Sequence, residues 1–520
     1  MTGTGDTELL TAFWAYEQAL ATNDLNGLDH WFLDAPGTLR AEGDTVLVGH
    51  TAIADFRRGR GGAPARVVER VHVVRPAPRV AVVTAETRRR DGSRGLQTQV
   101  WQHTDAGWRI AAAHVSAAAA PVPDDRPDPA VWRVTGSRED ARPLVASTGQ
   151  GPLAHVRTAV KDLFAVAGER VGAGNPAWLA EARTEEAHAD AVQRLLDAGA
   201  ELTGIAQTDE LAFSLAGTNT HYGTPANPAA PGRITGGSSS GPAAAVARGW
   251  ADLGLATDTA GSIRVPASYC GLYGWRPTHG ATPAAGLLAL APTFDTAGLL
   301  ARDPVLLRTA AEVLLPSGAA HPPVAELLVD EELVALAGPE TRASFEAACR
   351  ALTRPVVRTS TGVAEHLEDW LAAFRTVQAA EAWEQHGAWI GRHPGALAPD
   401  VAARFENGRR VTAAERTEAE QTLDSARKAL DAALLPGTAL LLPATSGAAP
   451  LTDAPPEQVE AVRAATLRLT CLASLAGLPA VVAPLLRVRS LPVGLCALGA
   501  RGTDRALLDL VADPGSPAHA

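Results

Sequence analysis

Two glycine- and serine-rich loops flank a short alanine-rich segment in residues 234–280, ITGGSSSGPAAAVARGWADLGLATDTAGSIRVPASYCGLYGWRPTHG. Ser238 lies in the first loop and Ser262 in the second, 24 positions later. Glycine permits tight turns and a close backbone approach to a ligand. Pro242 suits the first turn of a helix over Ala243–Arg248, which would return the chain and bring the loops together. This segment therefore predicts a site built from two serine loops.

Lysine is almost absent from the chain. Of 46 basic residues, only Lys161 and Lys428 are lysines, so arginine serves wherever a positive charge is enough. Arginine cannot release its proton in a protein, whereas a buried lysine can. Lys161 lies in the apolar segment AVKDLFAVAG, where burial would lower its pKa. Lys161 is therefore a candidate for a role that arginine cannot fill.

Composition limits the classes of protein that this chain can form. A chain of 520 residues with 46% apolar residues predicts two or three domains with a large core. A net charge of −11 disfavours a nucleic-acid partner. The start of the sequence has no signal-peptide pattern, and no apolar run is long enough to span a membrane. The four cysteines and fourteen histidines show no metal-ligand spacing. We expect a cytoplasmic protein that binds no membrane and uses neither a metal nor a cofactor.

The pattern along the chain predicts two domains joined by a linker. Residues 1–118 form an α+β domain with a helix over residues 6–21, a short helix over Gly49–Arg57, and strands at Ala65–Val74, Val80–Arg89, Leu96–His103 and Trp108–His114. Residues 119–143 are rich in proline and predict an extended linker. From 144 to 515, short apolar runs alternate with helical segments, which indicates an α/β domain.

The first domain resembles the nuclear-transport-factor-like (SnoaL-like) cone fold, and within it the AtzH-like proteins. The matching stretches are AFWAYEQALATNDLNGLDHWF and ETRRRDGSRGLQTQVWQHTDAGWRIAAAHVS. The resemblance implies a cone that dimerises through its sheet or holds a small ligand, so we expect a homodimer. Trp31, Trp101 and His114 are candidates for lining a cone pocket, although core packing is the expectation for each.

The second domain resembles the amidase signature family, and within it the plant-type amidases that are similar to indole-acetamide hydrolases. The resemblance rests on AVKDLFAVAG, TDELAFSLAGTNTHYGTPANP, GGSSSG, TDTAGSIRVPAS and FDTAGLLARDP, in that order. It implies a mixed central sheet flanked by helices and a Ser–cis-Ser–Lys triad. The nucleophile would be Ser262, the bridging serine Ser238 after a cis bond from Gly237, and the base Lys161.

The loop before Ser262 supplies the expected oxyanion hole. The backbone N–H groups of Thr259, Ala260 and Gly261, with that of Ser262, can point at a developing oxyanion. Ala260 stands where many family members have glycine, but its methyl group leaves the N–H intact. Phe213, Arg264 and Tyr269 are candidates for substrate binding. For Arg264, a structural pair with Asp258 is the stronger expectation.

The expected function is hydrolysis of a small-molecule carboxamide to a carboxylate and ammonia through an acyl-enzyme. The resemblances leave the substrate open between an arylacetamide and a ureide- or biuret-like amide. Two other classes stay open: an amidotransferase-type subunit, and a catalytically degenerate ligand-binding or regulatory protein. Two other motifs, G-x-S-x-G at 237–241 and S-x-x-K at 425–428, lack the flanking structure that their chemistry needs.

Overall fold

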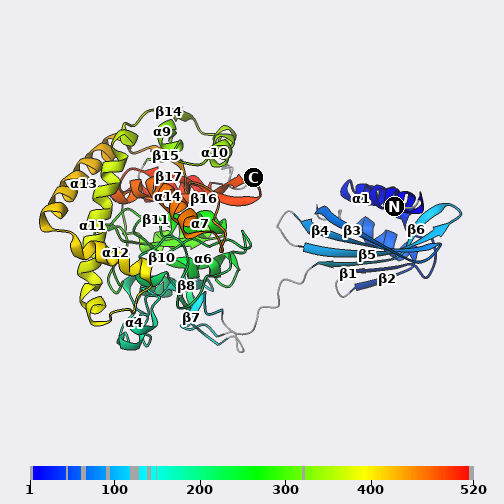
Figure 1. Ribbon diagram of the computed structural model, residues 1–520, viewed down its shortest axis with the longest axis horizontal. Helices are drawn as coiled ribbons and strands as arrows, with labels where there is room; N and C mark the ends of the chain where they lie inside the picture. Colours follow the sequence, from blue (N-terminus) through cyan, green and yellow to red (C-terminus); the bar gives the residue numbers. More distant parts are fainter. Residues whose placement is uncertain are drawn as a thin grey trace. The chain divides into compact units, whose positions relative to one another are not determined.

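The computed structural model describes residues 4–42, 45–59, 66–89, 94–117, 128–137, 142–147, 149–318 and 322–513. The chain divides into two compact units, Met1–Arg126 and Pro127–Ala520 (Figure 1). Among the described residues, no helix combines the length and the apolar character needed to cross a bilayer.

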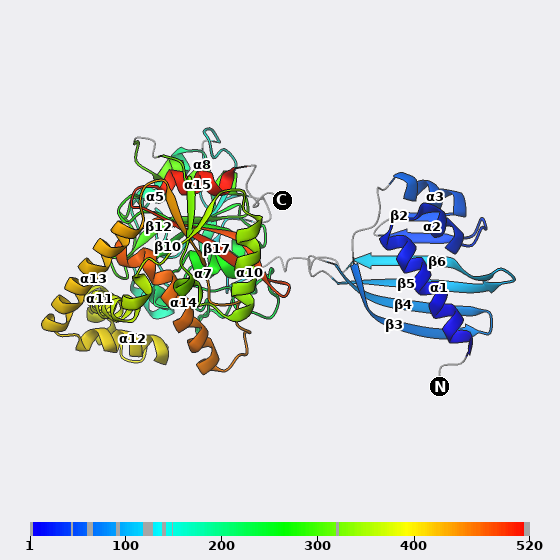
Figure 2. The ribbon, with the colours of Figure 1, turned by 90° about the horizontal axis from the view of Figure 1, so that it is seen from above.

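The N-terminal unit is a curved sheet with helices on one face. Its elements are α1 (Thr4–Ala21), α2 (Leu25–Trp31), β1 (Leu39–Glu42), β2 (Thr45–Val48), α3 (His50–Gly59), β3 (Arg66–Ala77), β4 (Val80–Arg89), β5 (Arg94–Thr104) and β6 (Gly107–Ala117). The strand order is β2-β1-β6-β5-β4-β3, antiparallel except for the parallel pair β1–β6. Helix α1 crosses one face of the sheet and buries Phe13 against Trp101 and Ile110 (Figure 2). The predicted helices and four strands are confirmed, whereas α2, β1 and β2 were not predicted.

The C-terminal unit is built around a mixed sheet of eleven strands, as expected. The order is β14-β13-β15-β17-β16-β11-β12-β10-β8-β9-β7. The strands are β7 (Trp132–Thr135), β8 (Arg157–Lys161), β9 (Glu201–Ala206), β10 (Leu253–Asp258), β11 (Tyr273–Arg276), β12 (Thr296–Ala301), β13 (Glu326–Val329), β14 (Val356–Arg358), β15 (Thr438–Pro443), β16 (Ala480–Val488) and β17 (Leu491–Gly499). Strands β10, β8 and β9 are parallel neighbours in that order, so their carboxyl ends lie side by side.

Helices cover both faces of this sheet. They are α4 (Pro176–Glu181), α5 (Asp190–Asp197), the 3-10 turn η1 (Glu210–Ala212), α6 (Ser240–Ala247), α7 (Arg264–Cys270), α8 (Pro304–Leu314), α9 (Glu331–Val334), α10 (Pro339–Ala351), α11 (Val363–Arg392), α12 (Pro399–Arg410), α13 (Ala413–Ala433), α14 (Pro456–Ala476) and α15 (Asp504–Ala512). Helices α5, α8 and α15 lie on one side of the sheet, and α10 and α14 on the other (Figure 2). Helices α11, α12 and α13 pack together as an outer layer (Figure 1).

The prediction of a linker over residues 119–143 is wrong at its C-terminal end. Strand β7 pairs with β9, and its first residue, Trp132, is buried together with Val131. Burial of these two apolar side chains ties this segment to the sheet even though prolines precede it. Much of the remaining predicted linker, residues 119–127 and 138–141, lies outside the described residues.

Candidate active site

Lys161 is the last residue of β8 and is fully buried. It lies where the carboxyl ends of β8, β9 and β10 come together. Its Nζ lies 2.9 Å from Ser238 Oγ, 3.0 Å from Ser239 Oγ and 2.7 Å from Thr257 Oγ1. Among the described residues it forms no ion pair. A neutral amine has two N–H donors and one lone pair. The three hydroxyl groups satisfy both protonation states. All three can accept from the charged form. Thr257 Oγ1 can donate to the lone pair of the neutral form, because Ser238 Oγ and Ser239 Oγ donate to Ser262 Oγ and to the carbonyl of Thr257.

The first serine loop places Ser238 between Lys161 and Ser262. The Gly237–Ser238 peptide bond is cis, as the family resemblance implied. Ser238 Oγ lies 3.1 Å from Ser262 Oγ, so a continuous chain of hydrogen bonds runs from Lys161 to Ser262. Gly237 has no room for a side chain, because a Cβ there would lie 2.2 Å from Asp209 Oδ2.

Asp209 anchors this loop from beneath. Its carboxylate accepts hydrogen bonds from Gly217 N at 2.9 Å and from Ser240 Oγ at 3.1 Å. Its own N–H donates to the carbonyl of Ser238 at 3.1 Å. Asp209 lies in the stretch TDELAFSLAGTNTHYGTPANP, and this role for it was not predicted. Its position before the 3-10 turn η1 gave no local signal of this long-range contact.

The second serine loop joins β10 to α7 and is held by Asp258. This carboxylate accepts from the N–H groups of Gly261 and Ile263 at 2.9 and 3.1 Å. It also pairs with the guanidinium groups of Arg264 and Arg276, each at 2.8 Å, and all three side chains are buried. A carboxylate with two buried cationic partners fixes the backbone on both sides of Ser262.

The backbone donors differ in one respect from the predicted oxyanion hole. The N–H of Gly261 is already donated to Asp258, so the prediction of Gly261 as a donor is wrong for this conformation. The N–H groups of Thr259, Ala260 and Ser262 have no protein partner among the described residues. The hydroxyl of Thr259 donates to Asp295 at 2.5 Å, which fixes the orientation of the first of these donors.

Burial and charge set the protonation of the site. Burial lowers the pKa of Lys161 from 10.5 to about 7, although the more distant carboxylates of Asp209, Asp295 and Asp258 oppose the change. Burial also raises the pKa of Asp209 above its ordinary value and that of Asp295 to about 6. Burial alone would raise the pKa of Asp258, but Arg264 and Arg276 outweigh it and hold that pKa below the usual range. A lysine with a pKa near 7 exchanges protons readily at neutral pH.

All three residues predicted to bind substrate are buried. Arg264 is fully buried, and its guanidinium donates hydrogen bonds to Asp258, to the carbonyl of Thr470 and to Ser474. The prediction that it binds substrate is wrong, and the alternative pair with Asp258 is confirmed. Tyr269 is buried beneath the first serine loop, where a Cβ on Gly236 would lie 2.9 Å from its ring.

Phe213 belongs to the C-terminal unit, whereas the three candidates for the cone pocket, Trp31, Trp101 and His114, belong to the N-terminal unit. Phe213 is 9% exposed and packs edge-on against Phe405 at 5.1 Å. In the N-terminal unit, Trp101 is buried in the core with the ring of Trp31 6.2 Å away. His114 is exposed on β6, so it does not line the interior of the cone.

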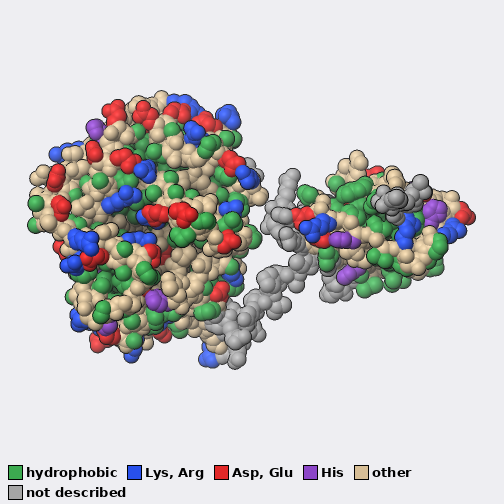
Figure 3. Space-filling view, in the orientation of Figure 1, with side chains coloured by type: hydrophobic (Ala, Val, Ile, Leu, Met, Phe, Trp, Pro, Cys, Tyr) green, Lys and Arg blue, Asp and Glu red, His purple; other side chains and the backbone are tan. Residues whose placement is uncertain are grey.

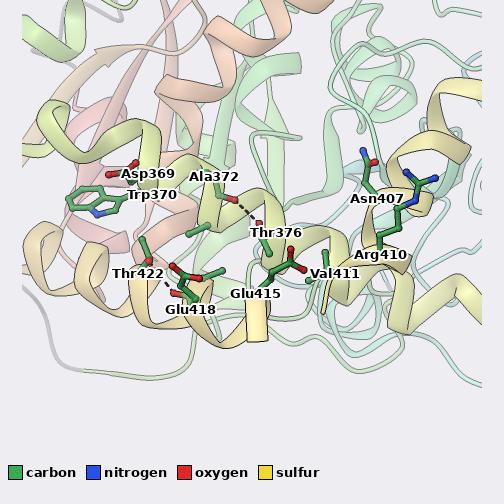
Figure 4. A pocket seen from close by; sticks show the side chains of 12 residues that line it. Asp369, Trp370, Ala372, Thr376, Asn407, Arg410, Val411, Glu415, Glu418 and Thr422 are labelled. Carbon is green, nitrogen blue, oxygen red and sulfur yellow. Dashed lines mark hydrogen bonds between the residues drawn. The ribbon is translucent and has the colours of Figure 1, made fainter. Parts of the chain in front are cut away.

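A cavity of about 640 Å³ lies among α11, α12 and α13, apart from the triad (Figure 4). Two of its charged lining groups have partners within the same helices: Glu415 bonds to Thr412 in a capping box, and Arg410 pairs with Glu406. Acidic and basic side chains are interspersed over the visible face of this unit (Figure 3). None of the residues that line this cavity belongs to the triad.

Comparisons with known proteins find matches to both units of the chain. Residues 134–315 match the family model described as Amidase, and residues 6–121 match the model described as AtzH-like. The chain is 32% identical over 408 residues to "Amidase 1" of Arabidopsis thaliana, covering 71% of this chain and 94% of that protein. It is 29% identical over 391 residues to "Outer envelope protein 64, chloroplastic" of Arabidopsis thaliana, covering 69% of this chain and 66% of that protein.

A solved structure extends the comparison to three dimensions. It is reported as "An unexpected vestigial protein complex reveals the evolutionary origins of an s-triazine catabolic enzyme", and it matches with 30% identity and a TM-score of 0.63. The match covers 69% of this chain and 83% of that one. The fold and these matches define an amidase-type hydrolase: the chain belongs to the amidase signature family. Its amidase domain is preceded by an AtzH-like domain.

Proposed function

We propose that the protein hydrolyses a small-molecule carboxamide to a carboxylate and ammonia, with Ser262 as the nucleophile. The observation that carries this proposal is the chain of hydrogen bonds from Lys161 through Ser238 to Ser262, with distances of 2.9 and 3.1 Å. A serine hydroxyl is a weak nucleophile unless a base takes its proton. An uncharged, buried Lys161 is that base.

In the acylation step, Ser262 Oγ attacks the amide carbon while its proton passes to Ser238. Ser238 passes its own proton to the lone pair of Lys161. The N–H groups of Thr259, Ala260 and Ser262 stabilise the oxyanion. As the C–N bond breaks, Ser238 returns a proton to the leaving nitrogen and is reprotonated by Lys161, so that ammonia departs.

In the deacylation step, a water molecule attacks the acyl-enzyme ester. The same pair of residues acts in the same order: Ser238 takes the proton of the water, and Lys161 takes that of Ser238. Collapse of the tetrahedral intermediate releases the carboxylate and returns the proton to Ser262. The step regenerates the neutral lysine and needs no cofactor.

The test is ammonia release from a panel of arylacetamides and of ureide- or biuret-like amides. We expect at least one of them to be hydrolysed, and Ser262→Ala and Lys161→Ala to reduce kcat/KM by about 10³-fold or more. Lys428→Ala is the matched control, because Lys428 is the other lysine of the chain and is exposed on α13. A folded protein that hydrolyses no member of the panel would contradict the proposal.

A second candidate function is that of a chain that works together with a partner protein and does not hydrolyse an amide by itself. The likeness to Outer envelope protein 64 shows that the fold also occurs in proteins not named as amidases. An amidotransferase-type subunit or a regulatory protein would therefore fit the fold. Ammonia release only after a partner is added would favour the subunit. Hydrolysis by the purified chain alone would exclude the regulatory role.

The AtzH-like domain has the features of a small-ligand site. Arg40 on β1 and Gln99 on β5 lie in one row of the sheet, separated by the small side chain of Ala113. Among the described residues, Gln99 Nε2 and Arg57 Nη2 are buried without a hydrogen-bond partner. Burying such donors unpaired costs about 1–3 kcal/mol each, which a bound acceptor would remove. We propose that this cone binds a small anion, tested by comparing titrations with acetate and acetamide in the wild type and Gln99→Leu.

We also propose that the protein is cytoplasmic and homodimeric. The composition supports the first point, and the likeness of the N-terminal domain to cone domains that pair through their sheets supports the second. Light scattering tests the oligomeric state, and a monomer at micromolar concentration would contradict the dimer.

A further inference from the structure

A recess of about 300 Å³ lies in the C-terminal unit, and no triad residue lines it. It is formed by the end of α14, the chain after β17, one position of α13 and the connection between β11 and β12. The lining residues are His279, Thr293, Arg427, Ser474, Ala476, Gly477 and Arg501.

The titratable groups that line this recess are all basic. Arg427, Arg501 and His279 come from three separate segments, and no carboxylate is among the described residues that line it. Two acidic groups near the recess bind residues that line it. Asp424 accepts from Arg427 Nη1 at 2.8 Å, and Glu381 accepts from the backbone and hydroxyl of Thr293 at 3.0 and 2.5 Å. Arg427 therefore already has a carboxylate partner, whereas Arg501 and His279 form no ion pair among the described residues.

The helix end that lines the recess does not repel an anion. The C-terminus of α14 carries partial negative charge on its last carbonyls. The carbonyl of Ala476 accepts from Arg501 Nη2 at 2.5 Å, and that of Gly477 accepts from the N–H of His279 at 3.1 Å. These two hydrogen bonds satisfy the carbonyls nearest to the recess.

The absence of a side chain at Gly477 keeps the cationic groups together. Its φ is 62°, and a Cβ there would lie 2.9 Å from His279 Cβ and 3.3 Å from Arg501 Nη1. His279 Nε2 lies 2.8 Å from the carbonyl of Pro292, so this nitrogen is a donor and Nδ1 is the remaining ring nitrogen. Burial lowers the pKa of His279, and Arg501 and Arg427 lower it further. A bound anion would reverse the effect of the two arginines.

We propose that this recess binds a small oxyanion, either phosphate or a carboxylate, through Arg427, Arg501 and His279. The site is connected to the nucleophile loop. Ser474 lies in its wall, and Arg264 Nη2 approaches Ser474 Oγ at 3.4 Å while also holding Asp258. An anion here would therefore act on the buried ion pair that fixes the loop around Ser262.

The binding experiment is a calorimetric titration of the full chain with inorganic phosphate and, separately, with malonate, at constant ionic strength set by sodium chloride. We expect binding in the millimolar range or tighter, weakened at least tenfold by Arg427→Gln. Arg427 is partly exposed, so this change should leave the fold intact. Arg409→Gln, an exposed arginine on α12, is the matched control. Whichever of the two titrants binds identifies the chemistry of the oxyanion.

Histidine NMR gives a second measurement that does not depend on catalysis. His279→Gln assigns the resonance, and saturating oxyanion should raise the pKa of His279 in the wild type but not in Arg427→Gln. Binding that persists unchanged in Arg427→Gln, or no binding of either anion above the chloride background, would overturn the proposal. Because neither measurement uses turnover, a failure here is distinguishable from a failure of the proposed amidase activity.

Discussion

Replacing Lys161 with methionine should abolish activity and, at the same time, stabilise the fold. Methionine retains the length of the side chain but removes its charge. Lys161 is fully buried, and its pKa is lowered from 10.5 to about 7. This lowering is equivalent to about 5 kcal/mol against the charged form, at about 1.4 kcal/mol per pH unit. The native state bears this cost whenever Lys161 is protonated.

The sign of the pH dependence follows from the direction of the pKa shift. Between pH 7 and 10.5 the unfolded chain keeps a proton on Lys161 that the folded chain has released, so the contribution of Lys161 to stability rises with pH. The methionine variant lacks this pH-dependent contribution to stability. Its advantage over the wild type should therefore fall by about 3 kcal/mol between pH 6 and pH 9. Ser238 Oγ and Ser239 Oγ keep their hydrogen bonds to Ser262 Oγ and to the carbonyl of Thr257, whereas Thr257 Oγ1 loses its bond to Nζ. The loss of that one partner costs roughly 1–3 kcal/mol at every pH, which leaves a net gain of about 2 kcal/mol at pH 7.

Urea denaturation of the wild type and Lys161→Met at pH 6, 7, 8 and 9 measures this difference. Titration of distant groups cancels between the two proteins. Lys428→Met is the control, because Lys428 is exposed and its replacement should give a difference that does not change with pH. A constant difference for Lys161→Met as well would refute the conclusion that Lys161 is largely neutral in the folded protein.

Four further results are expected. The kcat/KM of the wild type should rise with pH through an apparent pKa of about 7, measured by ammonia release, because protonated Lys161 cannot accept a proton. Gly237→Ala should destabilise the fold by about 2 kcal/mol or more in a thermal melt, since its Cβ would lie 2.2 Å from Asp209; an unchanged melting temperature would contradict this packing. Asp258→Asn should cost about 3–5 kcal/mol in urea denaturation, because two buried guanidinium groups lose their counter-ion. Thr259→Val removes the 2.5 Å hydrogen bond that orients an oxyanion donor, and should lower kcat about tenfold with little change in KM.

Much of the amidase site was predictable because its parts are local motifs in a fixed order. The serine loops depend on glycines at particular positions, and a lysine in an apolar segment stands out in a chain that otherwise uses arginine. The partners of these residues were not predictable. Thr257 and Ser239, which bind Lys161 Nζ, have side chains that occur at many positions in the sequence without such a role.

The predictions that the structure contradicts have the same origin, because in each case the segment forms a contact that its sequence pattern did not indicate. The N–H of Gly261 was expected to face an oxyanion, but the carboxylate three residues earlier competes for it. Arg264 was a candidate for binding substrate from its closeness to Ser262 in sequence, yet the turn of the loop directs it inward to Asp258. Proline content suggested a linker as far as residue 143, whereas pairing with β9 adds β7 to the sheet.

By itself the sequence determined the family, the two-domain order, and which lysine and serines were candidates for chemistry. These depend on residue types at short spacings, which the chain carries wherever it folds. Only the tertiary structure decided that Lys161 is fully buried among hydroxyl groups, that Asp209 supports Ser238, and that Asp258 lies between two arginines. Each of these depends on which strands become neighbours and on how completely water is excluded there, and burial is what moves the pKa of Lys161 to about 7.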